Sequence, residues 1–322
     1  MRAPSFWGPP ANRFSLAATA LAPAAWAYAA AHRLRWAVTT PRKAPVPVVC
    51  IGNLVAGGAG KTPAALAIAA RLRGRGALPH FLTRGHGGTA AGPLRVDPLH
   101  HGAATVGDEA LLLAAAAPTW VARDRLAGAD RAAAAGASVV VLDDGFQNPG
   151  IAKDVSFVVV DAAYGFGNGR TLPAGPLRES AAFGLERANA IVVIGGDCAL
   201  PGAKGPILRA RLEATEESRR RLAGARVLAF AGMGRPSKFF ATLAALGCNV
   251  VSSRAVADHH PYRPVELARL RAEAAAAGAR LVTTAKDLAR IEDRAGIEFL
   301  EVALAFDDEE ALDRVLAPAL HQ

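Results

Sequence analysis

The sequence lacks acidic side chains over its first 96 residues, because the first aspartate is Asp97. The same stretch carries twelve Lys and Arg, so residues 97–322 have a net charge of −3 within a total of +9. A basic first third favours an anionic partner, such as phosphate groups, an anionic membrane surface or nucleic acid. We expect no nucleic-acid partner, because no recognised motif is present and aromatic residues do not interleave with the basic ones as stacking platforms.

Cysteine is also scarce. Cys50, Cys198 and Cys248 are widely spaced and form no C-x-x-C pair. This excludes a disulfide framework and a zinc site of the usual spacing, and it fits a reduced, cytosolic setting in which these residues act as small buried hydrophobes. The length of 322 residues, of which 52% are hydrophobic, allows a sizeable core and suggests two domains.

The N-terminal region lacks an apolar run long enough for a typical membrane span. Residues 15–31 are uncharged, but they are mostly alanine with Pro23 in the middle. Four interpretations are open: a transmembrane helix, a signal peptide, a helix packed on the domain, and a helix lying in the membrane interface. The interfacial helix, at about residues 11–38, is favoured because aromatic residues and arginines flank the run and suit headgroups and anionic lipid.

Continuous apolar, β-branched segments alternate with alanine-rich helical segments. In the first part of the chain, strands are predicted at 46–54, 137–145, 154–162 and 188–196, with a helix at 63–76. A polar segment, residues 213–224, interrupts this pattern. It then restarts with strands at 226–232, 249–256, 280–285 and 298–304 and helices at 236–247 and 264–278. This alternation is typical of parallel α/β sheets, and the interruption predicts one domain over residues 1–220 and a smaller α/β domain over residues 221–322.

A glycine-rich turn follows the first predicted strand in the segment IGNLVAGGAGKTP, residues 51–63. Glycines let backbone N–H groups close around phosphate oxygens, the lysine meets the β- and γ-phosphates, and the threonine hydroxyl binds Mg²⁺. The residues predicted for these roles are Gly57, Gly58, Gly60, Lys61 and Thr62. Val55 stands where the strict motif has its first glycine, yet strand, turn and helix flank the segment correctly. The sequence therefore predicts an ATP-binding, P-loop NTPase-like sheet flanked by helices.

Two adjacent acids end the strand predicted at 137–145. Asp143 and Asp144 would lie at the carboxyl edge of the sheet, where the phosphate loop also lies. Either could hold Mg²⁺ directly or through water, although paired acids at a strand end can also serve only as a turn or a helix cap.

Further candidates are Asp108, at a predicted helix start, and His259, in a later turn. A carboxylate can act as a general base and a histidine can orient it; the simpler alternatives are a helix cap and a solvated turn. Phosphate is also recognised by arginine, and the candidates for that role are Arg84, Arg125 and Arg178.

Taken together, these motifs resemble one family closely, the tetraacyldisaccharide 4′-kinases of the lipid A pathway. The strings that carry the resemblance, in chain order, are IGNLVAGGAGKTP, TRGHGG, VGDEA, VLDDGFQNP, PAGPLRE, FAGMGRPSKFF, ADHHPY and TTAKD. The resemblance implies transfer of the γ-phosphoryl group of ATP, with Mg²⁺, to the 4′-hydroxyl of tetraacyldisaccharide 1-phosphate. It also implies a peripheral or N-terminally anchored protein at the cytoplasmic face of the bacterial inner membrane.

Residue roles follow from the same resemblance. It implies that Asp108 is the catalytic aspartate, that His259 is its partner, and that Asp143 and Asp144 are the acids on Mg²⁺. Two alternatives remain at this point. The first is a membrane-recruited P-loop ATPase or GTPase, acting as a switch or chaperone without a lipid acceptor. The second is a small-molecule kinase or ATP-dependent ligase, in which the N-terminal helix would be idle.

Overall fold

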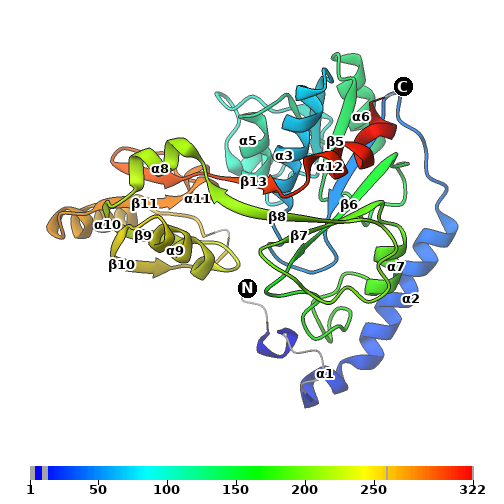
Figure 1. Cartoon of the computed structure of the whole chain (residues 1–322), viewed down its shortest axis with the longest axis horizontal. Coiled ribbons are helices and arrows are strands. Elements are labelled where there is room, and N and C mark those ends of the chain that lie inside the picture. The colour runs from blue at the N-terminus through cyan, green and yellow to red at the C-terminus, as the bar shows by residue number, and fades with distance from the viewer. Residues whose placement is uncertain (1–3, 9–13, 259, 321–322) are drawn as a thin grey trace.

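The computed structural model describes residues 4–8, 14–258 and 260–320. Within these residues the strands form two sheets with helices packed against them (Figure 1). The larger sheet has the strand order β13-β8-β7-β6-β1-β5-β2-β4-β3, and the smaller has the order β10-β9-β11-β12. The larger sheet is parallel except for β3 and β13, and the smaller sheet is parallel throughout. The predicted α/β class with two sheets is confirmed.

The strands of the larger sheet are β1 (Val48–Gly52), β2 (Pro79–Thr83), β3 (Leu94–Arg95), β4 (Thr119–Val121), β5 (Val139–Asp143), β6 (Val155–Asp161), β7 (Ala190–Ile194), β8 (Ile207–Ala214) and β13 (Val302–Phe306). Those of the smaller sheet are β9 (Arg226–Ala231), β10 (Asn249–Ala255), β11 (Arg280–Thr284) and β12 (Ile297–Leu300).

The helices are α1 (Leu16–Ala20), α2 (Ala22–Val38), α3 (Lys61–Gly74), α4 (Ala103–Val106), α5 (Asp108–Ala114), α6 (Arg125–Ala134), α7 (Ala181–Glu186), α8 (Glu216–Leu222), α9 (Pro236–Ala245), α10 (Pro264–Ala276), α11 (Ala285–Leu288) and α12 (Glu309–Leu316). Two short 3₁₀ helices are η1 (Ser5–Trp7) and η2 (Ala317–Ala319).

The larger sheet is buried on both faces, which explains the continuous apolar runs of its central strands. Along β1, Val49 and Ile51 belong to one core cluster, while Val48 and Cys50 belong to the cluster on the opposite face. This alternation follows from the pleat of a strand, in which successive side chains point to opposite faces. The predicted strands at 46–54, 137–145, 154–162 and 188–196 correspond to β1, β5, β6 and β7.

The strand predicted at 298–304 is in fact two strands in different sheets. β12 ends in the smaller sheet at Leu300, and β13 begins at Val302 and pairs antiparallel with β8 of the larger sheet. α12 also contributes Leu312 and Leu316 to the core of the larger sheet. The predicted division at residue 220 did not anticipate this return of the chain. We propose that residues 216–300 form the smaller unit, and we refer to it below as the small domain.

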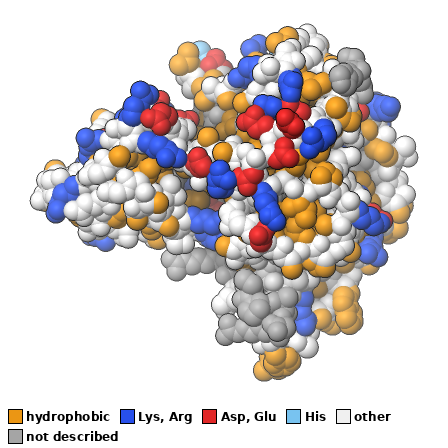
Figure 2. Space-filling view, viewed as in Figure 1, with side chains coloured by type: hydrophobic (Ala, Val, Ile, Leu, Met, Phe, Trp, Pro, Cys, Tyr) orange, Lys and Arg blue, Asp and Glu red, His pale blue; other side chains and the backbone are white. Residues whose placement is uncertain are grey.

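The N-terminal helices α1 and α2 lie along one side of the larger unit (Figure 1). Ala18 and Ala25 are buried, while Phe14, Leu16 and Trp26 are more than 70% exposed. Hydrophobic side chains are visible at the lower tip of the space-filling view, where Figure 1 places α1 (Figure 2). Among the described residues, no helix has both the length and the apolar character needed to cross a membrane.

Candidate active site

The phosphate loop and the paired acids follow two neighbouring strands. β1 and β5 pair in parallel with Ile51 opposite Asp143. The loop leaves β1 after Gly52 and ends at Lys61, the first residue of α3. Because the carboxyl ends of parallel strands meet at one edge of a sheet, the fold brings the predicted loop and the predicted acids together.

Glycine is required at the turn into α3. The angle φ is +128° at Gly57 and +90° at Gly60, a region that L side chains rarely adopt. A Cβ atom on Gly60 would also lie 2.6 Å from Cδ1 of Ile194. Gly60 is the N-cap of α3 and supplies no side-chain acceptor to the first N–H groups of the helix. Such N–H groups at a helix start bind anions.

The side chain of Asp144 lies between two cations. Its Oδ1 atom is 3.8 Å from Nζ of Lys61 and accepts a hydrogen bond of 2.8 Å from Nη1 of Arg178. Burial opposes ionisation of Asp144, but Lys61 and Arg178 outweigh it and lower the pKa of the carboxyl. Asp144 is therefore a carboxylate at neutral pH, and it orients the lysine of the loop.

Asp143 is in a different electrostatic state. It is fully buried, and neither side-chain oxygen has a hydrogen-bond partner within the described part of the chain. Burial raises the pKa of Asp143 to about 8, and the negative charges of Glu109 and Asp144 add to that rise against the opposing charge of Lys61. Unpaired buried carboxyl oxygens require a partner, and a divalent cation is one that satisfies them.

Hydrogen bonds from the side chains of Asn53 and Gln147 stabilise the shape of the phosphate loop. The buried side chain of Asn53 donates from Nδ2 to the carbonyls of Val55 (2.8 Å) and Gly57 (3.2 Å). Gln147 donates from Nε2 to the carbonyl of Asn53 (2.9 Å) and to Oε1 of Glu179 (3.0 Å). The shape of the loop therefore depends on the buried carboxylate of Glu179, which lies in the segment between β6 and α7.

That carboxylate is neutralised by Arg187, which also contacts the N-terminal helix. Nη2 of Arg187 lies 2.6 Å from Oε2 of Glu179. The guanidinium carbon is 4.1 Å from the ring centroids of both Trp36 in α2 and Phe183 in α7. We did not assign a role to Gln147, Glu179 or Arg187 from the sequence, although the first two lie within the strings DDGFQ and PAGPLRE.

The three predicted phosphate-binding arginines differ in their surroundings. Arg178 reaches Asp144, as described above. Arg125 is buried and donates from Nη1 to the carbonyls of Ala122 (2.7 Å) and Arg123 (3.2 Å). Burial, and then the positive charge of Arg84, lower the pKa of Arg125. Arg84 is exposed. The structure therefore brings Arg178 to the edge that carries the loop, and the phosphate-binding roles of all three arginines stay predictions.

Asp108 faces the small domain. It is 3% exposed, and its Oδ2 atom lies 3.0 Å from Nε of Arg290 and 4.0 Å from Nζ of Lys286. Lys286 also lies 3.2 Å from Oε1 of Glu109. Burial opposes the charge on Lys286, but Glu109 and Asp108 outweigh it and raise the pKa of the amine. Lys286 is the lysine of the string TTAKD, and no role was predicted for it from the sequence.

His259, the predicted partner of Asp108, lies outside the described residues. Its neighbour His260 is engaged elsewhere, with Nε2 at 3.0 and 2.8 Å from the two carboxyl oxygens of Glu266. The pairing of Asp108 with His259 therefore stays a prediction, and the structure gives His260 a different partner.

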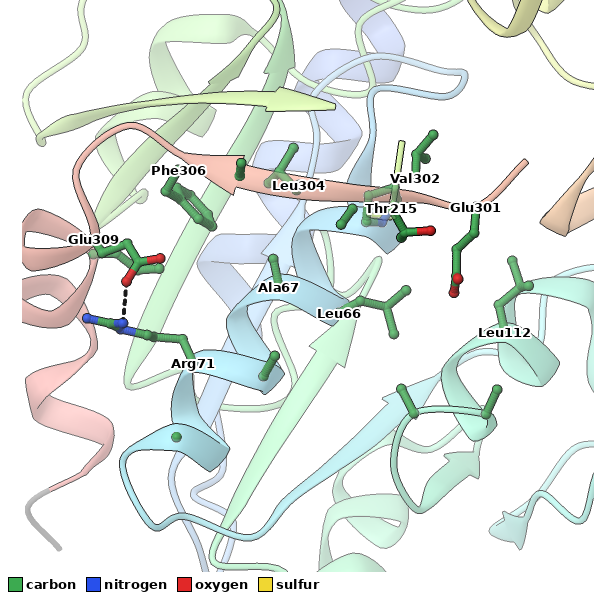
Figure 3. Close-up of a pocket in the computed structure, with 18 of the residues that line it drawn as sticks. Leu66, Ala67, Arg71, Leu112, Thr215, Glu301, Val302, Leu304, Phe306 and Glu309 are labelled. Carbon is green, nitrogen blue, oxygen red and sulfur yellow. Dashed lines mark hydrogen bonds and ion pairs between the residues drawn. The ribbon is translucent and has the colours of Figure 1, made fainter. Parts of the chain in front are cut away.

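A hollow of about 620 Å³ is lined by residues of α3, β13 and α12 (Figure 3). Leu66, Ala67 and Arg71 of α3 face Leu304 and Phe306 of β13 across it. Neither the loop glycines nor the paired acids line it. The hollow is therefore not the phosphate site.

The fold and this edge define an α/β protein of the P-loop phosphotransferase class. Comparison with known proteins is more specific. A family model described as tetraacyldisaccharide-1-P 4′-kinase matches residues 17–321. The tetraacyldisaccharide 4′-kinase of Rhodospirillum centenum is 55% identical over 327 aligned positions, covering 99% of this chain and 97% of that protein. The one from Rhodospirillum rubrum is 49% identical over 326 positions, covering 98% and 97%.

A solved structure shares the fold. It is the "apo" form of LpxK from Aquifex aeolicus in complex with ATP, with a TM-score of 0.76 and 24% identity over 94% of this chain and 99% of that one. The chain belongs to the tetraacyldisaccharide-1-P 4′-kinase family. The resemblance inferred from the motifs is therefore confirmed, and so is the assignment of the protein as a kinase.

The first testable prediction concerns Glu179, whose carboxylate supports the phosphate loop through Gln147. Replacing Glu179 by Gln should lower the free energy of unfolding by about 1–3 kcal/mol, because the partly buried guanidinium of Arg187 would keep its charge without a carboxylate partner. Amide hydrogen exchange in residues 53–60 should also rise, since the amide offers one acceptor oxygen where Gln147 and Arg187 now use two. Urea unfolding and exchange mass spectrometry measure these two effects.

Glu186 provides the matched control, because its ion pair with Lys204 is exposed on both sides. Replacing Glu186 by Gln should change stability by less than about 0.5 kcal/mol and leave exchange in the loop unchanged. Equal behaviour of the two variants would contradict a supporting role for Glu179.

Proposed function

We propose a set of residue roles for the activity of this family, the ATP-dependent phosphorylation of tetraacyldisaccharide 1-phosphate at its 4′-position. The observation that carries the proposal is the meeting of Lys61, Asp143 and Asp144 at one sheet edge, with Asp108 buried at the small-domain interface. These are the parts that phosphoryl transfer requires: a phosphate cradle, acids for a metal ion, and a base.

The donor nucleotide binds at the phosphate loop. The N–H groups of Gly57, Gly58 and Gly60 face its phosphate oxygens, and Lys61 contacts the β- and γ-phosphates. ATP in the complex solved for the Aquifex aeolicus protein supports this choice of nucleotide.

Mg²⁺ fits the side chains of Thr62, Asp143 and Asp144. Hydroxyl and carboxylate oxygens are its preferred protein ligands, and the buried oxygens of Asp143 have no other partner within the described residues. The raised pKa of Asp143 means that a cation must displace a proton from this carboxyl at neutral pH. When bound, the ion neutralises charge on the transferring phosphoryl group.

Asp108 receives the proton of the 4′-hydroxyl as the phosphoryl group moves. A sugar hydroxyl becomes an effective nucleophile only when a positioned base can take its proton. Asp108 is buried at the contact with the small domain, where its Oδ2 atom lies 3.0 Å from Nε of Arg290 and 4.0 Å from Nζ of Lys286. We propose that His259 orients this carboxylate, and that Arg84, Arg125 and Arg178 serve the phosphate groups of donor and lipid.

The lipid acceptor is presented at the cytoplasmic face of the inner membrane, with α1 and α2 resting on the bilayer surface. Their packed side is anchored by Trp36, whereas Phe14, Leu16 and Trp26 are exposed. Arg33 and other exposed cations of this region suit anionic headgroups. Family membership favours this lipid kinase over a switch or chaperone that lacks a lipid acceptor. Incubating labelled ATP with tetraacyldisaccharide 1-phosphate, with and without the protein, tests the activity directly.

Removing the loop lysine should abolish most of the activity. In Lys61→Met the rate of lipid phosphorylation should fall on the order of 10²-fold or more, because a cation on the transferring phosphoryl group is lost. The exposed Lys204, replaced by Met in the same way, serves as the control. A rate near wild type in the first variant would show that the loop is misassigned.

The proposed base and its partner should act as one unit. The double variant Asp108→Ala/His259→Ala should then be little slower than Asp108→Ala alone, since groups that act together lose their effect only once. Nucleotide affinity, measured by calorimetry, should barely change. His260→Ala is the control, because His260 is bonded to Glu266. Fully multiplicative losses for Asp108 and His259 would refute the pair.

Membrane binding should depend on the exposed apolar side chains of the N-terminal helices. Changing Phe14, Leu16 and Trp26 together to Ser should weaken sedimentation with anionic liposomes at least about tenfold, because three apolar groups no longer enter the interface. Deletion of the helix is a poorer test, since Trp36 packs on Arg187. Leu99→Ser, at a residue 90% exposed elsewhere, is the control. Equal sedimentation of all forms would favour a helix that only packs on the domain.

A further inference from the structure

The string FAGMGRPSKFF contains a turn for which neither the motifs nor the proposed function has a role. Residues 232–235 connect β9 to α9 in the small domain. The turn is firmly held within that domain, because Asp287 accepts hydrogen bonds from the N–H of Gly232 at 3.0 and 3.1 Å. Arg290 also donates to the carbonyl of Gly232 at 3.1 Å. A turn fixed in this way moves with the small domain as one body.

Two cations from this turn and the helix after it converge on one carboxylate of the larger unit. The side chains of Arg235 and Lys238 both contact Oδ2 of Asp161, the last residue of β6. Asp161 is only 5% exposed, and its other oxygen accepts a hydrogen bond from the N–H of Ala163. Because Asp161 is buried while the side chains of Arg235 and Lys238 are 29% and 37% exposed, water screens this ion pair less than a fully exposed one.

The same turn touches the phosphate loop. Nη2 of Arg235 donates to the carbonyl of Gly58 at 3.3 Å. A Cβ atom on Gly234 would lie 3.9 Å from the amide nitrogen of Gly58, so the two backbones are close. Arg235 therefore joins three parts: the small domain, the end of β6 and the loop that we propose holds the nucleotide.

This contact differs in position from the one that involves Asp108. Asp161 ends β6, which pairs with β1 on the side opposite β5. Asp108 begins α5, which packs near β4 and β2 on the far side of β5. The two interdomain contacts thus flank the phosphate loop, and the Asp161 contact includes none of the residues assigned to metal or base.

We infer that Asp161, Arg235 and Lys238 form a latch that holds the small domain closed over the phosphate loop, and that they are positioning residues for phosphoryl transfer. The inference deepens the proposed function, since it assumes that ATP binds at the loop. With the latch broken, the competent closed form is less populated. The apparent affinity for nucleotide then falls in proportion to that population.

The experiment compares Asp161→Asn, Lys238→Met and the double variant in the full-length protein. Each single variant should raise the KM for ATP and lower kcat/KM about tenfold. The double variant should be little worse than Asp161→Asn, because both changes break the same pair. Lys238→Arg should restore most of the activity, since it retains the charge and the reach. Arg254→Met removes a small-domain cation whose partner, Glu273, is in the same domain, and it should behave as wild type.

Small-angle X-ray scattering without nucleotide tests the latch independently of the proposed ATP site. The radius of gyration should increase in Asp161→Asn and Lys238→Met and remain at the wild-type value in Arg254→Met. This result would support the latch even if ATP bound elsewhere. Unchanged scattering and unchanged KM in both latch variants would overturn the inference. So would a lowered melting temperature in Asp161→Asn with no effect of Lys238→Met, because the carboxylate would then serve only the stability of the larger unit.

Discussion

The site depends on one register, the parallel pairing of β1 with β5 that sets Ile51 opposite Asp143. A slip of one residue would turn the side chains of β1 to the opposite faces and shift the phosphate loop relative to the paired acids. The register is enforced by burial on both faces, because Ile51 belongs to one core cluster and Cys50 to the other. The packed core therefore fixes the position of the site. The glycines determine only the shape of the loop that follows β1.

The fold brings together opposite charges that lie far apart in the sequence. The first 96 residues carry cations and no acids, yet those of α3 meet acids from much later segments. Lys61 lies beside Asp144, and Arg71 pairs with Asp313 of α12. The return of the chain through β13 therefore does more than complete the sheet, since it brings α12 and its acids to the basic helix. What remains exposed around α2 is a basic, partly aromatic surface, which is why we propose that it contacts the membrane.

Much of the fold and part of the site could be predicted from the sequence, for identifiable reasons. β1, β5, β6 and β7 were found because strands buried on both faces are continuous apolar runs. Strand β8, which lies between β13 and β7, was missed because its buried and exposed residues alternate within a segment that contains two arginines. The change of sheet between Leu300 and Val302 was missed because the apolar pattern continues across it. Glu179 was overlooked as a support of the loop because its partners, Gln147 and Arg187, meet it only through tertiary contacts.

The two interdomain contacts have the same distribution of charge. At both contacts the acids belong to the larger unit and the cations to the small domain: Asp108 meets Arg290, and Asp161 meets Lys238. Asp144 adds to the negative charge at this edge of the larger sheet, whereas the raised pKa of Asp143 keeps that carboxyl largely protonated until a cation binds. Lys61 and Arg178 offset only part of this charge. The small domain pairs its cations with acids on both sides of the proposed phosphate loop, so closure should favour the anionic nucleotide and complete the surroundings of the proposed base. We therefore expect the second domain to contribute to nucleotide binding as well as to catalysis.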